Sequence, residues 1–265
     1  TLSVYDLIMI SLGSIIGSGI FVLTGEAAAT KAGPAVIVSF ILAGITASFA
    51  ALSYSELTSM IPISGSSYTF VYATMGELLA WIIGWDLILE YLVGAAAVAV
   101  GWSGYFVSFF ADCGVTLSSS WTSAPVKYDT KSSEFHVIPG AYFNVPAFVV
   151  VIFLTILLTI GIKESARVNS VVVSIKLIVI VIFCIAAGTH VNPNNYKPFI
   201  PPNEGTFSRF GITGVLAGTT VVFFAFIGFD SISTTAQETK NPQRDVPIAI
   251  LTSFTIVSVL YVAVS

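Results

Sequence analysis

Two stretches decide the fold of this chain: Leu12-Gly-Ser-Ile-Ile-Gly-Ser-Gly-Ile-Phe21 and Phe223-Phe-Ala-Phe-Ile-Gly-Phe-Asp230. Each places glycine in the middle of an apolar run that is long enough to enter a membrane. An interrupted helix frees backbone N–H and C=O groups, and lipid cannot supply partners for them. Because such interruptions persist where the freed groups face a cavity or a ligand, these stretches predict a solute-binding site.

The composition predicts an integral membrane protein surrounded by the lipid bilayer. Of 265 residues, 55% are hydrophobic and 9% are charged, and the mean hydropathy is +0.93. A soluble domain carries about 25% charged residues. The net charge of −4 and the lack of a basic run argue against a nucleic-acid partner. The two cysteines have no metal or redox spacing, and we expect no metal and no cofactor.

Apolar runs of about 20 residues predict seven membrane spans. The seventh run is still apolar at Ser265, so we expect the sequence to be a fragment of a longer protein. The residues between spans 2 and 3 are expected to form a short interfacial helix, and residues 163–167 a tight charged turn. The predicted spans are Val4–Ala29, Gly33–Ser59, Glu77–Phe110, Val145–Ile162, Val168–Gly188, Gly211–Ala236 and Val246–Ser265.

The short loops set the predicted orientation. Lys163, Arg167, Lys240 and Arg244 lie in two short turns on one side of the membrane, whereas the cations of the other side lie mostly in longer loops. Short loops rich in lysine and arginine face the cytoplasm. The N-terminus is therefore predicted to be cytoplasmic, in a plasma (cell inner) membrane.

The two interruptions offer opposite chemistry. A turn at Gly17-Ser18-Gly19 would expose N–H groups at the positive end of the next half-helix, which suits a carboxylate. A turn near Phe224 to Ile227 would expose C=O groups, which suit an ammonium, and Asp230 is expected to cap the half-helix that follows. Together they fit the zwitterionic end of an α-amino acid.

A single interrupted span would say little, because glycine is common in membrane helices. Two interruptions in spans 1 and 6 fall at corresponding positions if the protein consists of two five-span repeats. The expected division is residues 1–189 for the first repeat and residues 190–265 for the start of the second.

Several motifs resemble the amino acid–polyamine–organocation (APC) superfamily of transporters. Its first helix resembles Asp6 to Phe21, and its sixth helix and following turn resemble Phe226-Ile-Gly-Phe-Asp230 and Glu238-x-x-Asn241-Pro-Gln-x-x-Val-Pro247. The resemblance covers essentially the whole chain and is closest to the cationic amino acid transporter branch and its bacterial relatives. Further matching segments are Gly33-Pro34-Ala35, Tyr54-Ser55-Glu56, Pro62-x-x-Gly65-Ser66-x-Tyr68, Gly76-Glu77-Leu78 and Gly84-Trp85.

The resemblance implies an all-α polytopic membrane protein with the inverted-repeat fold of the leucine transporter class, truncated here to about seven helices with helices 1 and 6 discontinuous. It implies that the amides of Gly17, Ser18 and Gly19 hold the substrate carboxylate. The amino group would be held by the carbonyls of Ile15, Phe224, Ala225 and Ile227. Phe226 belongs to a group of phenylalanines of which one or two are expected to line the side-chain pocket.

Two charged residues inside predicted spans are further candidates, because intramembrane charges are usually functional. Lys176 lies eight residues into span 5 and could load and release a proton, although a lysine stem can also snorkel to the interface. In proton-coupled members of the superfamily a lysine of the fifth helix takes the place of a bound cation. Glu90 of span 3 is either a proton relay or a structural carboxylate.

The sequence therefore predicts a secondary active transporter of neutral or cationic amino acids, working by alternating access and coupled to protons. A proton-independent exchanger and a non-transporting amino acid sensor remain open as alternatives. An enzyme is not expected, because Asp86 and Asp230 lack the motifs of an intramembrane aspartyl protease.

Overall fold

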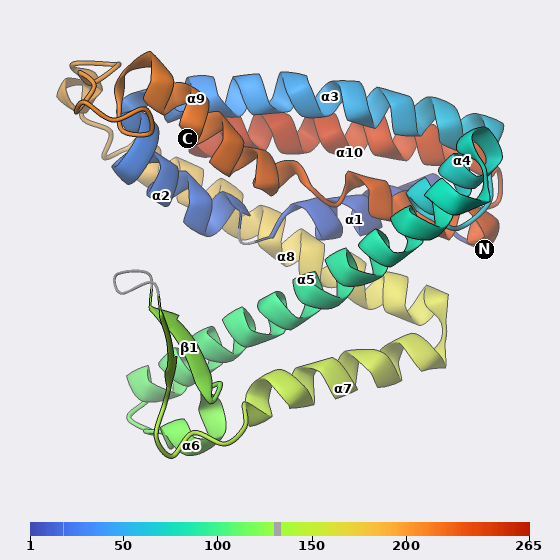
Figure 1. Ribbon diagram of the computed structural model, residues 1–265, viewed down its shortest axis with the longest axis horizontal. Coiled ribbons are helices and arrows are strands. Elements are labelled where there is room, and N and C mark those ends of the chain that lie inside the picture. The colour runs from blue at the N-terminus through green and yellow to red at the C-terminus, as the bar shows by residue number, and fades with distance from the viewer. Residues whose placement is uncertain (18, 130–133) are drawn as a thin grey trace. The chain divides into compact units, whose positions relative to one another are not determined.

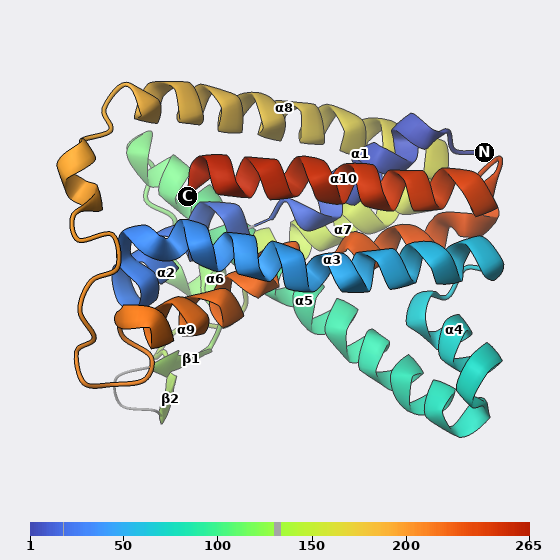
Figure 2. The same ribbon diagram turned by 90° about the horizontal axis from the view of Figure 1, so that it is seen from above.

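The computed structural model describes residues 1–17, 19–129 and 134–265, and they are mostly helical (Figures 1 and 2). The membrane-protein fold class is confirmed, with one addition that the sequence did not predict, a short hairpin between spans 3 and 4. The α-helices are α1 (Val4–Ile15), α2 (Thr24–Ala27), α3 (Val36–Met60), α4 (Ser66–Met75), α5 (Glu77–Asp112), α6 (Ser119–Thr122), α7 (Val145–Ile160), α8 (Ile162–Gly188), α9 (Gly211–Phe223) and α10 (Pro242–Val264).

Six further helical segments differ from the α-helix in their winding. The π-helical segments are η1 (Gly19–Leu23) and η2 (Ala28–Ala32), and the 3₁₀ segments are η3 (Gly33–Ala35), η4 (Pro193–Tyr196), η5 (Phe224–Phe226) and η6 (Phe229–Glu238). The antiparallel hairpin consists of β1 (Val126–Asp129) and β2 (Glu134–Val137), with Val126 opposite Val137. The π and 3₁₀ segments concentrate in predicted spans 1 and 6, where the regular winding fails.

Within the described residues, five helical stretches are long and apolar enough to cross a membrane, and two shorter apolar helices accompany them. Together these stretches cover the seven predicted spans. The short helix expected after span 2 is α4. The charged turn expected at residues 163–167 is wrong, because Gly161, with φ of +153°, makes the turn alone and the charged residues form the first turns of α8.

The chain divides into two compact units, residues 1–80 with 165–265 and residues 81–164. The first unit holds both interrupted spans, and the second holds most of α5, the hairpin and α7. This division into compact units does not follow the predicted repeat boundary at residue 189. The boundary describes how the two repeats divide the sequence, and it stays a prediction.

The core of the first unit lies between α3, α10 and α1, with the segments of predicted span 6 packed against them (Figures 1 and 2). Helix α3 presents a stripe of small buried residues, Ala43, Ala47, Ala51 and Ser55, one every fourth position. Small residues let membrane helices approach closely, and close approach supplies the packing that lipid does not drive.

The second unit contains mainly exposed apolar side chains. Helix α5 carries large hydrophobic residues on all its faces, and most of them are exposed. Asn144 links the elements at one end of this unit, because its Oδ1 accepts hydrogen bonds from the Ser103 hydroxyl at 2.7 Å and from the Ala147 amide at 3.1 Å. Apolar exposure of this extent is typical of surface that faces lipid or other membrane helices.

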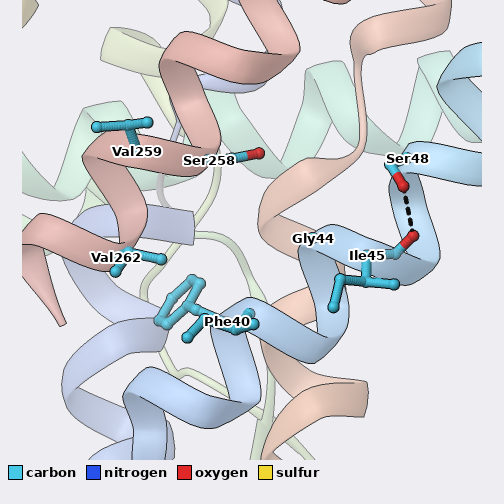
Figure 3. A pocket seen from close by; sticks show the side chains of 8 residues that line it. Phe40, Gly44, Ile45, Ser48, Ser258, Val259 and Val262 are labelled. Atoms are coloured by element: carbon cyan, nitrogen blue, oxygen red, sulfur yellow. Dashed lines mark hydrogen bonds between the residues drawn. The ribbon is translucent and has the colours of Figure 1, made fainter.

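A concavity of about 420 Å³ opens between α3 and α10 (Figure 3). Phe40 and Gly44 line it from α3, and Val259 and Val262 line it from α10. The hydroxyl of Ser258 donates to the Phe254 carbonyl of its own helix. The concavity is therefore an apolar groove with little to offer the charged groups of an amino acid.

Candidate functional site

The first helix interruption follows α1. Helix α1 begins with a capping box between Ser3 and Asp6, in which each side chain pairs with the backbone of the other, and it ends at Ile15. Ile16 is extended (φ −76°, ψ 91°), and the chain resumes as a helix at Gly19. Ser18, the central predicted carboxylate ligand, lies outside the described residues. The predicted interruption of span 1 is confirmed at Ile16–Gly17.

The second helix interruption lies slightly later than the sequence suggested. Phe224–Phe226 form a tight 3₁₀ turn, after which Ile227 is extended (φ −63°, ψ 143°) and Gly228 is left-handed (φ +115°). A left-handed residue reverses the winding, and glycine adopts this conformation without the steric cost that a side chain imposes. The interruption is therefore centred on Ile227–Gly228, and the 3₁₀ segment η6 follows it.

The two interruptions touch each other, although more than 200 residues separate them in the sequence. A Cβ atom added to Gly19 would lie 2.6 Å from the Cβ of Ala225. A Cβ atom added to Gly228 would lie 2.7 Å from the Ser14 carbonyl oxygen. Only glycine allows the two backbones to approach this closely. The sequence prediction that the two interruptions meet is in this respect confirmed.

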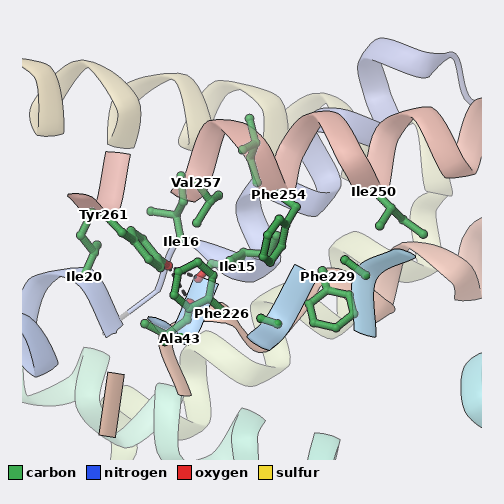
Figure 4. Packing of buried hydrophobic residues seen from close by; sticks show 14 of the residues in the cluster. Ile15, Ile16, Ile20, Ala43, Phe226, Phe229, Ile250, Phe254, Val257 and Tyr261 are labelled. Carbon is green, nitrogen blue, oxygen red and sulfur yellow. Dashed lines mark hydrogen bonds between the residues drawn. The ribbon is translucent and has the colours of Figure 1, made fainter. Parts of the chain in front are cut away.

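A tyrosine that the sequence analysis did not single out joins the two interruptions. The hydroxyl of Tyr261, from α10, lies 2.7 Å from the Ala225 carbonyl oxygen and 3.0 Å from that of Ile15 (Figure 4). The ring is fully buried and packs edge-on against Phe40 and Phe226. Since a hydroxyl has one proton to donate, the two carbonyls share it. Both had been predicted to hold the substrate's amino group.

Lys176 of α8 meets the end of α1. Its Nζ donates to the Ile16 carbonyl at 2.5 Å and to the Gly13 carbonyl at 3.3 Å. The last carbonyls of a helix carry partial negative charge and lack partners within the helix, so a cation there stabilises them. The side chain thus contacts the first interruption directly, and it does not snorkel away from it.

The predicted site residues fall into exposed and buried groups. Gly17 and Phe224 are exposed, and Ile227 is 39% exposed. Ala225 is buried, and Phe226 is fully buried. The Phe226 ring packs against rings of α3 and α10, so its side chain belongs to the core. Of the exposed members, Phe224 and Ile227 can contact a solute with their side chains, whereas Gly17 can do so only with its backbone.

Asp230 lies in the first turn of η6, whose N-cap residue is Gly228. The residue is 9% exposed, and the Ser66 hydroxyl of α4 donates to its carboxyl group at 3.5 Å. Tyr54 packs edge-on against Phe229 beside it. Asp230 therefore helps to join α4 to the segment after the second interruption, and it lies two positions after Gly228, which takes the N-cap position expected for Asp230.

Glu90 lies on α5 in the second unit, and its side chain is exposed there. Its role in proton coupling stays a prediction. Among the residues that the structure describes, no group of three His, Cys, Asp or Glu side chains lies close enough to hold a metal ion.

The fold and the paired interruptions define a class of membrane protein, and a comparison with known families identifies it. The family model described as "Amino acid permease" matches residues 2–265. The chain belongs to this amino acid permease family and is an integral, multi-pass membrane protein. The family consists of permeases and transporters, in agreement with the APC resemblance.

Curated relatives match the chain over its whole length. It is 48% identical over 266 residues to the branched-chain amino acid permease BcaP of Bacillus subtilis (strain 168), covering 53% of that protein. It is 45% identical to the methylthioribose transporter of the same organism, covering 54% of it. It is 38% identical to cationic amino acid transporter 4 of Homo sapiens, covering 40% of it. The chain spans about half the length of the curated relatives it matches.

Proposed function

We propose that this chain forms the substrate-binding part of a secondary active transporter of amino acids. One observation carries the proposal: two interrupted helices meet in one core, with Gly19 against Ala225 and Gly228 against Ser14. Freed amides of the first interruption would hold the carboxylate, and freed carbonyls of the second would hold the ammonium. The relatives named as amino acid permease and cationic amino acid transporter support this substrate class.

The transport cycle would work by alternating access. A bound amino acid bridges the ends of α1 and α9, so it favours the arrangement in which both interruptions are closed around it. The tyrosine that already joins them, Tyr261, would keep the two chain segments in register while the solute enters and leaves. Protein outside this chain would complete the pocket wall, because the chain spans about half the length of its relatives.

We further propose that transport is a proton symport. Lys176 is the cation that contacts the end of α1, at 2.5 Å from the Ile16 carbonyl. Loss of its proton would remove the charge that holds this end of the helix, and the half-helix could then move. Proton occupancy and substrate occupancy would thereby act on the same segment. Glu90 is retained as a second candidate for the proton path.

The orientation is also a proposal. The Leu2 amide donates to the Glu238 carbonyl at 2.8 Å, so the N-terminal residues lie beside the loop that carries Lys240 and leads into α10, whose first turn carries Arg244. Short cationic loops face the cytoplasm. We place this loop and the N-terminal residues in the cytoplasm, and the protein in the plasma membrane.

The test is uptake of radiolabelled amino acids into liposomes that contain the intact protein. We expect branched-chain or cationic amino acids to accumulate when the outside is made acidic, and Lys176→Met to remove the response to the gradient. Lys163→Met is the matched control, since Lys163 is exposed in the first turn of α8.

Other outcomes would decide among the alternatives. Uptake that needs amino acid on the other side and ignores the pH gradient would identify an exchanger. Binding without flux would identify a sensor. Methylthioribose is the second candidate substrate, favoured by the transporter of that name. Its uptake in preference to every amino acid would contradict the assignment of an amino acid substrate.

A further inference from the structure

Helix α8 contacts α1 through one stripe of residues. Ala166, Val173 and Ile180 are the buried residues of α8, and they recur every seven positions. Asn169 and Lys176 stand three residues after the first two of them. This is the spacing of a helix–helix seam, in which alternate steps of three and four residues keep one face toward the partner helix.

Both polar members of this seam donate to the backbone of α1. The Asn169 side-chain amide donates to the Met9 carbonyl at 3.0 Å. Lys176 donates to the carbonyls of Gly13 and Ile16. The three acceptors are spaced by four and three residues, so they lie along one face of α1. The contact is a ladder of side-chain donors on backbone carbonyls.

The seam leaves no room between Asn169 and α1. A Cβ atom on Gly13 would lie 2.6 Å from the Asn169 Oδ1 and 3.0 Å from the Val173 Cγ2. Both ends of the Asn169 amide therefore meet the α1 backbone, since its oxygen packs closely against Gly13 and its nitrogen donates to the Met9 carbonyl. Such a contact resists sliding of one helix along the other, since a polar residue in a seam specifies its register.

We propose that Asn169 is a positioning residue that sets the register of α8 on α1 and so places the Lys176 ammonium at the end of α1. The two side chains lie seven residues apart on the same face of α8, so a contact that fixes the position of Asn169 along α1 also fixes the position of Lys176. A slip of one turn would move Lys176 by about 5.4 Å and carry it away from the Ile16 carbonyl. The proposal rests on the proposed role of Lys176 in transport.

Few other ionisable groups lie where they could produce the pH dependence that is assigned to Lys176. On α1 the charged side chain is Asp6, which is held in the capping box with Ser3 at the opposite end of the helix. On α8 the nearest cation along the chain is Arg167, which is exposed. Tyr261 of α10 faces the same end of α1 through the Ile15 carbonyl. The test therefore includes a substitution of Lys176 itself, so that its share of any pH effect can be measured.

The test uses the intact protein in liposomes and five variants. Asn169→Leu keeps the approximate volume and removes the donor, and Asn169→Gln keeps an amide donor. Ser170→Ala is the matched control, because the Ser170 hydroxyl donates to Ala166 of its own helix. Lys176→Met, alone and combined with Asn169→Leu, completes a double-mutant cycle.

We expect Asn169→Leu to lower the uptake rate about tenfold, since it removes a part-buried hydrogen bond, and to move the pH midpoint of uptake by about one unit. Asn169→Gln should recover at least part of the uptake rate and of the pH midpoint, and Ser170→Ala should leave both quantities unchanged. A uniform loss of rate with an unchanged pH midpoint would overturn the proposal, because a merely structural asparagine gives that result.

A second measurement separates this proposal from the proton-coupling proposal. If the unmodified protein takes up substrate independently of pH, the proton-coupling proposal is wrong. The melting temperatures of the variants in the double-mutant cycle then decide whether Asn169 positions Lys176. Strong non-additivity between Asn169→Leu and Lys176→Met would support positioning. Additive losses would refute it.

Discussion

The two interruptions differ in what holds their carbonyl ends. The end of α1 is held by the Lys176 ammonium, which comes from a separate helix and carries a charge that loss of its proton would remove, and also by the Tyr261 hydroxyl through Ile15. The end of the 3₁₀ turn after α9 is held by the neutral Tyr261 hydroxyl through Ala225. We therefore propose that the first end responds to protons and that the second end stays fixed.

The backbone shows the same contrast. At the first interruption Ile16 is extended, and Gly17 has open space around it. At the second, Gly228 is left-handed and touches the Ser14 carbonyl. The first interruption is open at Gly17, whereas the second is tightly packed at Gly228. The following substitutions test this difference, from the largest expected effect to the smallest.

Gly228→Ala should be the most damaging change. A Cβ atom would lie 2.7 Å from the Ser14 carbonyl oxygen, and φ of +115° is strained for alanine. We expect a loss of about 3 kcal/mol of stability, measured as a lower melting temperature in detergent. Gly25→Ala is the control, since a Cβ atom there meets nothing within 4 Å. An unchanged melting temperature for Gly228→Ala would mean that the tight packing is misassigned.

Gly19→Ala should separate the interruptions. Its Cβ atom would lie 2.6 Å from the Ala225 Cβ, which forces the segments apart at a cost of about 2 kcal/mol. Uptake should fall at least tenfold, since 1.4 kcal/mol already corresponds to a factor of ten. Gly17→Ala, in open space, should leave the melting temperature unchanged. If Gly19→Ala transports like the unmodified protein, close approach is not required.

Tyr261→Phe removes the hydroxyl that joins the two interruptions and leaves the ring in place. Two carbonyls lose a shared donor, so stability should fall by about 1.5 kcal/mol. Substrate affinity should change in the same variant, because the Ile15 and Ala225 carbonyls lie at the proposed ammonium site. Tyr5→Phe, at an exposed position, is the control. Identical affinity in both variants would separate Tyr261 from the binding site.

Ser258→Ala should have the smallest effect. Its hydroxyl donates within α10 and lines the apolar groove. Stability should change by less than about 0.5 kcal/mol, and uptake kinetics should be unchanged. Altered substrate preference in this variant would show that the groove of Figure 3 takes part in recognition.

The elements were predictable because hydrophobic runs and glycine positions are local signals. The spans came from apolar length, and the interruptions from Gly17, Gly19 and Gly228. The winding around them was not predictable, since 3₁₀ and π segments depend on packing. The start of α8 at Ile162 was missed because the charged residues 163–167 were interpreted as a turn, whereas Gly161 alone makes the turn.

The site was only half predictable for a similar reason. Lys176 was identified by its charge in an apolar span. Tyr261 and Asn169 were missed, because a tyrosine or an asparagine in a membrane helix is not unusual by itself. The seven-residue recurrence of Ala166, Val173 and Ile180 was a signal that could have placed Asn169 on a contact face.

The sequence by itself determined that this is a membrane protein with two interrupted helices and one lysine within a span, because composition and glycine placement act locally. Only the tertiary structure decided that Gly19 meets Ala225, that Tyr261 joins the two segments, and that Lys176 binds the end of α1. These contacts join residues up to 246 positions apart. No local pattern encodes such pairs, since they depend on how close-packed helices align their faces.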